Sequence, residues 1–221
     1  VLCLAYLWHA ARSCLHLWRC PVTPATLKRL REARAVSTPL IAISTADQWA
    51  TMATVRDAYA SEPKIPPIVQ WDCARAFLPV NPPGEDAIAK MLPKDPDAID
   101  TTTPGLNLIE ALTLATKLPQ RTLLFLLNAD LFLEEPAVIQ GVMNLRELFK
   151  ENQRTLVLLG TIVRLPVQLQ QDVFTFDEPL PLPDAIRAII VREVASVREV
   201  AKDIEDPSDE TIRLSVEALT G

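Results

Sequence analysis

Residues 122–132 read TLLFLLNADLF. An unbroken apolar run, residues 123–127, precedes the polar residues Asn128 and Asp130. A strand of a parallel sheet is buried on both faces, so it is apolar throughout, and its carboxyl end commonly carries the polar side chains of a ligand site. The stretch therefore predicts a buried parallel strand with a candidate site at its end.

Other short apolar runs predict four more strands, at residues 39–44, 67–71, 155–159 and 173–176. Between the strands, apolar residues recur at helical spacing. The predicted helices are residues 24–35, 45–60 (with Thr45 or Asp47 near its start), 106–117 and 136–150, the last with a stripe of Val138, Val142, Leu145 and Phe149. Alternating helices and apolar strands predict an open, parallel α/β sheet of about five strands, with helices on both faces.

Two other segments have a distinct composition. Residues 78–105 are dense in Pro, Asp and Thr and predict a long irregular excursion. Residues 183–221 return to helical spacing, and Ser208 is expected to begin the last helix.

The chain has 19 Pro and only 5 Gly. We therefore expect its turns to depend on the fixed φ of proline more than on left-handed backbone.

The composition also argues against several classes of function. With a net charge of −6 and a pI near 5.0, the chain lacks the excess of basic residues that a nucleic-acid-binding surface needs. Residues 1–22 are apolar, but His9, Arg12 and Arg19 interrupt them, which predicts a helical extension and not a membrane span. The four cysteines form no CxxC pair. We therefore expect reduced thiols, a cytoplasmic-type compartment and no metal site.

The loop after the first predicted strand does not resemble a phosphate-binding loop. A P-loop needs GxxxxGK[ST] directly after a strand, because its backbone N–H groups must surround the phosphates and its lysine must reach them. Here the strand at residues 39–44 is followed by TADQWATM, which contains neither Gly nor Lys and includes the bulky Trp49. Sterics and charge therefore disfavour the usual mode of triphosphate binding.

Over residues 24–221 the amino-acid sequence nevertheless resembles AAA-type ATPases. It most closely resembles the amino-terminal half of the plastid and cyanobacterial reading-frame family of AAA-type ATPases. The matching stretches are TPLIAIST, LFLLNADLFL, NLRELFKENQRTLVLLGTIVRLPVQL and FDEPLPLPDAI. The resemblance implies a P-loop NTPase or AAA-like α/β domain at residues 23–182. It further implies the start of a truncated helical lid at residues 183–221, after an N-terminal helical extension at residues 1–22.

The resemblance also shows where this chain departs from active family members. The acidic motif that would hold magnesium and polarise water in phosphoryl transfer corresponds to Asn128 and Ala129. Asp130 is a poor substitute, since neighbouring residues of a strand point to opposite faces. Thr161 retains a hydroxyl at the sensor position, and only Arg164 stands near the place of an arginine finger. We expect no catalytic and no metal-binding residue, and only Asn128, Asp130 and Thr161 as remnants of a nucleotide site.

Simpler roles exist for the same residues. Asn128 and Asp130 can cap the loop after their strand, Thr161 can serve a turn, and Asp177 and Glu178 can be solvated acids of a hinge. Trp49 and Trp71 can pack in a core or an interface instead of binding a base.

The leading hypothesis is a non-catalytic AAA-like domain that acts as a structural or regulatory platform for an ATP-hydrolysing module further along the same chain. ATP and magnesium would then belong to the parent protein and not to this segment. A homo-oligomer and a cytoplasmic or plastid stromal location are implied by the resemblance. The alternatives are an ATP-binding AAA module with atypical motifs and a stand-alone α/β interaction domain of flavodoxin-like build.

Overall fold

The structure is a computed structural model that describes residues 24–92, 103–178, 183–200 and 208–220. The chain divides into two compact units, of which the larger ends at Glu178. The predicted extension at residues 1–22 lies outside the described residues. None of the described helices is both long and apolar enough to cross a membrane.

The larger unit is built on one six-stranded sheet with the order β3-β2-β4-β5-β1-β6. The strands are β1 Leu40–Ser44, β2 Ile68–Asp72, β3 Ala76–Pro79, β4 Leu123–Leu126, β5 Thr155–Gly160 and β6 Phe174–Asp177. All pairs are parallel except β2 with β3, which form an antiparallel hairpin. The prediction of an open parallel α/β sheet is confirmed for every strand pair except β2 with β3, and the prediction of about five strands misses β3.

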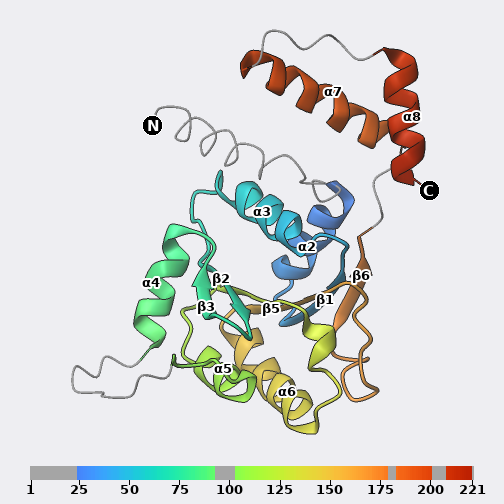
Figure 1. The fold of residues 1–221 in the computed structure, drawn as a ribbon. Coiled ribbons are helices and arrows are strands. Elements are labelled where there is room, and N and C mark those ends of the chain that lie inside the picture. The colour runs from blue at the N-terminus through green and yellow to red at the C-terminus, as the bar shows by residue number, and fades with distance from the viewer. Residues whose placement is uncertain (1–23, 93–102, 179–182, 201–207, 221) are drawn as a thin grey trace. The chain divides into compact units, whose positions relative to one another are not determined.

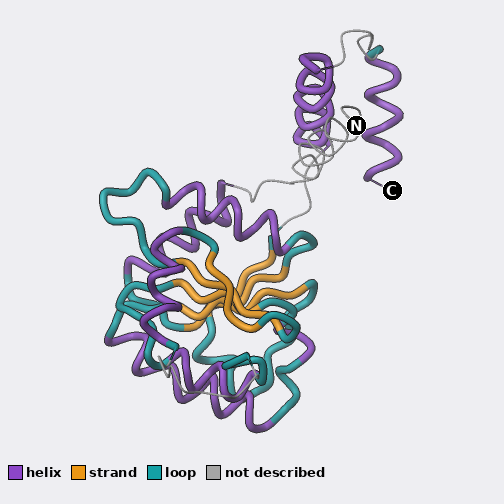
Figure 2. The backbone as a smooth tube through the Cα atoms, turned by 60° about the vertical axis from the view of Figure 1, so that its left-hand side comes forward, coloured by secondary structure: helices purple, strands orange, loops and turns teal. Residues whose placement is uncertain are grey.

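Helices cover both faces of this sheet (Figures 1 and 2). Helices α2 (Pro24–Ala35) and α3 (Gln48–Tyr59) pack on the face we call the first face, where the core includes Leu30, Met52, Ile43 and Phe125. Helices α5 (Leu108–Ala115) and α6 (Pro136–Glu151) cover the second face together with Leu169 and Val173. The predicted stripe of α6 is confirmed, because Val138, Val142, Leu145 and Phe149 are all at most 1% exposed.

The prediction of an irregular excursion at residues 78–105 is wrong for its first half. The end of β3 and helix α4 (Pro82–Met91) lie there, and α4 packs on β2 and β3. Asn81 begins α4: its Oδ1 accepts hydrogen bonds from the N–H groups of Gly84 and Ile68, both at 2.9 Å. Its Nδ2 donates to the Pro66 carbonyl at 2.9 Å. Residues 93–102 of the predicted excursion lie outside the described residues.

Left-handed backbone is more common than the glycine count suggested. Within the described ranges, the non-glycine residues with positive φ are Ser37, Ala76, Arg121, Asn128 and Gln153. Gln153 follows α6 in a Schellman motif, in which the N–H of Arg154 donates to the Phe149 carbonyl at 2.8 Å. The expectation that turns depend mainly on proline is therefore wrong for these five positions.

The smaller unit contains helices α7 (Pro183–Val200) and α8 (Asp209–Thr220), which pack against each other. Ser208 begins α8 as predicted, and its Oγ accepts a hydrogen bond from the N–H of Thr211 at 3.1 Å. An ion pair joins Arg187 of α7 to Asp209 of α8.

Candidate functional site at the carboxyl edge of the sheet

The candidate site lies where the neighbouring strands β1 and β5 end. The chain leaves β1 toward the first face, where α3 packs, and leaves β5 toward the second face, where Leu169 and Val173 are buried. In open α/β sheets, ligands bind beyond the carboxyl ends of two neighbouring strands whose connections leave to opposite faces. The residues that follow β1, β4, β5 and β6 therefore form the candidate site.

The connection from β1 to α3 consists of only Thr45, Ala46 and Asp47. Asp47 caps α3, because its Oδ1 accepts a hydrogen bond from the N–H of Ala50 at 2.9 Å. One of the two predicted cap positions is thus correct. A connection this short, with a carboxylate at the start of the helix, leaves no loop that could surround a phosphate chain.

Thr45 and Thr51 hold the carboxylate of Glu178 at the start of α3. Oε2 of Glu178 accepts a hydrogen bond from Thr45 Oγ1 at 2.9 Å and from Thr51 Oγ1 at 2.8 Å. The threonines are 4% and 0% exposed, and their hydroxyl oxygens lie 3.0 Å apart. The N–H of Glu178 also donates to the Ser44 carbonyl at 2.8 Å. The prediction that Glu178 is a solvated hinge acid is therefore wrong.

Asn128 is connected to the start of α3 by two hydrogen bonds. Gln48 Nε2 donates to Asn128 Oδ1 at 2.8 Å, and the backbone N–H of Asn128 donates to Gln48 Oε1 at 2.9 Å. Asn128 has left-handed backbone with φ 51°, which Asn tolerates better than most residues. Its position turns the chain from β4 into the short 3₁₀ helix η1 (Ala129–Leu131).

Strand alternation does not turn Asp130 away, because β4 ends at Leu126 and Asp130 lies in η1. The side chain lies against the end of β5: a methyl group added to Gly160 would be 2.3 Å from Asp130 Oδ1. A side chain at position 160 would therefore require Asp130 to move. Ala129, which the sequence resemblance pairs with the second position of the acidic motif, is fully buried.

Thr161 and Arg164 both lie exposed on the segment after β5. Of the three expected remnants, the structure therefore joins Asn128 to α3 and places Asp130 beside Gly160. Sequence reasoning missed the roles of Gln48, Thr51 and Glu178. No short-range signal identifies them, because Thr51 and Glu178 are 127 positions apart. Among the described residues, no group of His, Cys, Asp and Glu could hold a metal ion.

At the end of β2, Asp72 organises the turn into β3. Its carboxylate accepts hydrogen bonds from the N–H groups of Ala74 and Arg75, at 3.0 and 2.8 Å, and from Arg75 Nε at 2.9 Å. Burial by itself would raise the pKa of Asp72, but these hydrogen bonds outweigh it and the pKa is lowered. Asp72 is thus a charged turn residue, with its charge compensated locally.

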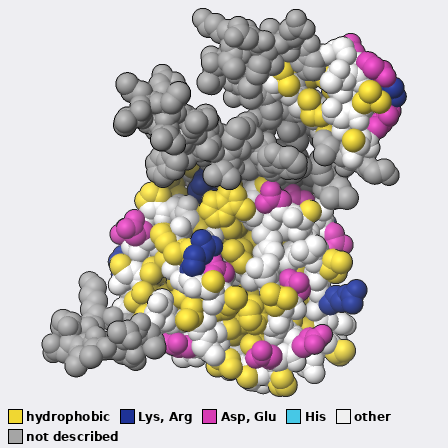
Figure 3. Space-filling model, in the orientation of Figure 1, with side chains coloured by type: hydrophobic (Ala, Val, Ile, Leu, Met, Phe, Trp, Pro, Cys, Tyr) yellow, Lys and Arg dark blue, Asp and Glu magenta, His cyan; other side chains and the backbone are white. Residues whose placement is uncertain are grey.

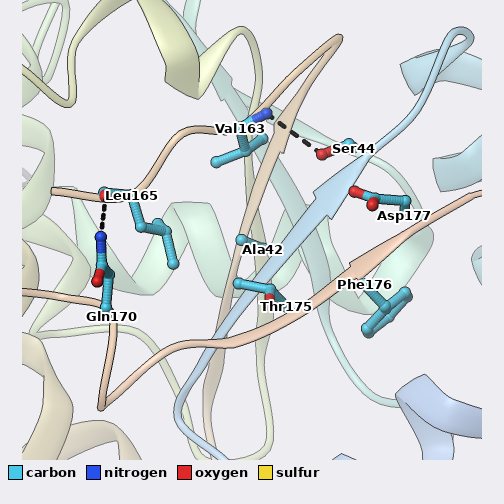
Figure 4. A pocket seen from close by; sticks show the side chains of 8 residues that line it. All are labelled: Ala42, Ser44, Val163, Leu165, Gln170, Thr175, Phe176 and Asp177. Carbon is cyan, nitrogen blue, oxygen red and sulfur yellow. Dashed lines mark hydrogen bonds between the residues drawn. The ribbon is translucent and has the colours of Figure 1, made fainter. Parts of the chain in front are cut away.

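A hollow of about 260 Å³ opens on the second face beside β1 and β6 (Figure 4). Its lining includes Ser44 of β1, Thr175 and Asp177 of β6, and Gln170 of the segment between β5 and β6. Ser44 Oγ accepts a hydrogen bond from the N–H of Val163 at 3.3 Å, and Gln170 Nε2 donates to the Leu165 carbonyl at 3.1 Å. The segment between β5 and β6 is therefore attached to the rim of the hollow.

Residues 24–178 match the family model described as "SpoVK-like AAA ATPase, N-terminal domain". The chain belongs to this family. The match covers the larger unit from α2 to Glu178, so the SpoVK-like amino-terminal domain is the six-stranded sheet with its helices. The resemblance to AAA-type ATPases is thereby confirmed.

Comparison with solved structures finds domain III of the replication initiation protein DnaA from Thermotoga maritima. The TM-score is 0.48 at 12% sequence identity, and the similarity covers 89% of this chain and 77% of that one. No curated protein gives a significant sequence match.

Proposed function

We propose that this SpoVK-like amino-terminal domain is a non-catalytic AAA-like domain that serves as a platform for an ATP-hydrolysing module of the same protein. The observation that carries the proposal is the contact of Glu178 with Thr45 and Thr51 at the start of α3. That is where a P-loop enzyme would hold phosphate groups. A carboxylate held there repels a triphosphate and fills the space it needs.

The chemistry of the surrounding residues supports the same proposal. Magnesium and attacking water need carboxylates at the end of β4, and the resemblance pairs those positions with Asn128 and Ala129. The side-chain oxygen of Asn128 already accepts a hydrogen bond from Gln48, and the buried methyl group of Ala129 can neither bind magnesium nor polarise water. Residues 44–51 contain no lysine to reach a phosphate. These residues do not fit magnesium-bound ATP, so ATP and magnesium are assigned to the other module.

A platform needs apolar surface that another domain can cover. Leu131, Ile162 and Val167, on the segments that leave β4 and β5, are 68%, 60% and 78% exposed. On the face of the larger unit turned toward the viewer, hydrophobic side chains lie in several groups, with polar atoms and single charged side chains between them (Figure 3). Exposed apolar area of this kind commonly marks contact with a partner. Membership of the plastid and cyanobacterial branch remains part of the proposal and follows from the sequence resemblance.

Nucleotide binding is tested with the whole chain. A fluorescent ATP analogue is titrated with magnesium, and an active P-loop ATPase serves as the positive control. We expect no saturable binding up to about 1 mM. Saturable binding in the micromolar range that is weakened by Thr51→Val would overturn the non-catalytic assignment, because it would place nucleotide at the start of α3.

The platform role is tested in the protein encoded by the complete reading frame. The double substitution Leu131→Ser and Ile162→Ser should lower ATP hydrolysis severalfold while leaving the unfolding of the isolated chain unchanged. The matched control is Val36→Ser, since Val36 is 75% exposed just before β1, at the opposite edge of the sheet. Equal hydrolysis rates for the double variant and the control would contradict this role, as would a reading frame without a P-loop.

A further inference from the structure

Strand β6 forms one edge of the sheet, and among the described residues it hydrogen-bonds only to β1. Its four residues include two aromatic ones: Phe174, which is 40% exposed, and Phe176, which is buried in the first-face core. An unpaired edge presents N–H and C=O groups that can pair with another extended chain.

The hydrogen bonds identify which backbone groups face outward. The N–H of Glu178 donates to the Ser44 carbonyl of β1. Because backbone groups alternate in direction along a strand, those of Phe174 and Phe176 also face β1. The N–H and C=O groups of Thr175 and Asp177 then point away from the sheet. These two residues offer two N–H and two C=O groups to an added strand.

The two faces of β6 differ in chemistry. On the first face, Arg29 of α2 lies over the rings of Phe174 and Phe176, at 5.5 and 5.1 Å from their centres. On the second face, Thr175 and Asp177 line the hollow of about 260 Å³. Figure 4 shows the carboxylate of Asp177 directed toward Ser44. Asp177 is the only ionisable residue in the lining, and no hydrogen bond or ion pair joins it to another described residue.

We propose that the edge of β6 binds an extended peptide segment in which basic side chains alternate with apolar ones. The peptide backbone pairs with the outward groups of Thr175 and Asp177. Its basic side chain lies beside Asp177 at the hollow, where the hydroxyls of Ser44 and Thr175 and the Oε1 of Gln170 supply further hydrogen-bond acceptors. Strand addition of this kind takes its affinity from main-chain hydrogen bonds and its specificity from alternate side chains.

The alternation follows from the geometry of the sheet. Neighbouring side chains of an added strand point to opposite faces, so a residue beside Asp177 is followed by one beside the aromatic pair. Arg29 already provides a cation over that pair, and a second basic residue there would be repelled. Apolar side chains on that face gain contact with the exposed ring of Phe174. A segment with basic residues at every position, or with acidic ones beside Asp177, does not fit.

The proposal is tested with the whole chain and a short fluorescein-labelled peptide in which lysine alternates with valine. We expect saturable binding, weakened about tenfold by Asp177→Asn through loss of a charge-assisted hydrogen bond. The substitution Asp177→Lys should abolish binding of this peptide. The Asp177→Lys variant should instead bind a peptide in which glutamate replaces lysine. The matched control is Asp86→Asn, an exposed carboxylate on α4 far from β6 in the sheet order, which should leave binding unchanged.

Two further measurements test the strand edge itself. A peptide with N-methylated amides along one edge should not bind, and hydrogen exchange at the Thr175 and Asp177 amides should slow only when the unmodified peptide is added. Absence of saturable binding, equal binding of the N-methylated peptide, or equal binding by Asp177→Lys would each overturn the proposal. So would slow exchange of the two amides in the free chain, because the edge would then already be covered.

Discussion

Thr51 Oγ1 in the first turn of α3 donates a hydrogen bond to Glu178 Oε2, across 127 positions of sequence. The bond joins the residue that follows the last strand to the helix that follows the first strand. Thr51 is completely buried, so its hydroxyl depends on partners within the protein.

The first prediction concerns this contact. Thr51→Val keeps the shape of the side chain but removes the hydroxyl, so Glu178 loses one of its two threonine donors. We expect the free energy of unfolding to fall by about 1–2 kcal/mol, measured by urea denaturation. The matched control is Thr113→Val, since the exposed Thr113 hydroxyl donates only to the Ile109 carbonyl of its own helix. A loss no larger than in the control would show that the contact contributes nothing.

The second prediction concerns the left-handed residue after α6. Gln153 has φ 54°, a conformation that is strained for residues with a Cβ and unstrained for glycine. We therefore expect Gln153→Gly to stabilise the fold by about 0.5–1 kcal/mol. Gln153→Ala is the control, because alanine keeps the Cβ and should give no gain. Chemical denaturation distinguishes the two variants, and destabilisation by the glycine would refute the assignment of strain.

The third prediction concerns Arg154, which is only 7% exposed. Its Nη1 donates to the Thr116 carbonyl at 3.0 Å and its Nε to the Pro119 carbonyl at 3.2 Å, and it lies 5.7 Å from the centre of the Phe149 ring. Burial lowers the pKa of its guanidinium. Arg154→Met should destabilise by about 2–3 kcal/mol, because the Thr116 carbonyl after α5 loses its guanidinium donor and the Pro119 carbonyl keeps only the hydroxyl of Thr122.

The control for Arg154 is Lys150→Met, an exposed basic residue in the last turn of α6. It should change stability by less than about 0.5 kcal/mol. Thermal unfolding followed by circular dichroism measures both variants. Similar melting temperatures for the two would mean that the carbonyls find other partners when Arg154 is removed.

The fourth prediction concerns the pH dependence of stability. The pKa of Asp72 is lowered in the folded protein, so its contribution is fully present above the unfolded pKa of about 3.9 and is lost as pH falls through the folded value. The side chain of Arg75 is 59% exposed, so the contribution is at most about 1 kcal/mol. Asp72→Asn should therefore be less stable than the wild type at pH 6, with the difference shrinking below pH of about 4.

A stability difference between wild type and Asp72→Asn that stays constant across that pH range would contradict the fourth prediction. Arg75→Ala provides a second measurement. It removes the side-chain donor while leaving the carboxylate, so it should reduce the pH dependence without abolishing it, because the backbone N–H groups of Ala74 and Arg75 remain.

The fifth prediction compares two helical glycines. A methyl group at Gly84 would lie 2.1 Å from the Ile68 carbonyl oxygen, which is backbone and cannot move aside. Gly84→Ala should therefore separate α4 from β2 and destabilise by more than about 3 kcal/mol. At Gly141 the nearest atom is Leu112 Cδ1, the end of a flexible side chain, at 2.7 Å. Gly141→Ala should be tolerated better, and equal losses in denaturation experiments would refute this reading of α4 packing.

The strands could be predicted because burial on both faces leaves a direct trace in the sequence. Leu123, Leu124, Phe125 and Leu126 are all at most 2% exposed, and their run of apolar letters has no other simple explanation. Strand β3 leaves no such trace. It is a short antiparallel edge, and its hairpin uses Ala76 at φ 58° where a glycine would have signalled the turn.

Helix α4 was missed for a different reason. The density of proline suggested an irregular segment, whereas Asn81 followed by Pro82 and Pro83 is also the pattern of a capped helix start. For the site, the sequence predicted polar residues at the strand ends, and Asn128 does lie just beyond β4. It could not predict that Thr51 meets Glu178, because that contact depends on β6 lying next to β1 and not on local spacing.

The attachment of Glu178 also decides how a mechanical load would reach this domain. Tension along the chain beyond residue 178 enters at a residue whose N–H is bonded to Ser44 and whose carboxylate is bonded to Thr45 and Thr51. The pull is therefore shared between an inner strand and the helix that follows it, and does not fall on the edge strand alone. A domain connected in this way would remain intact under forces that strip a free terminal strand from its sheet.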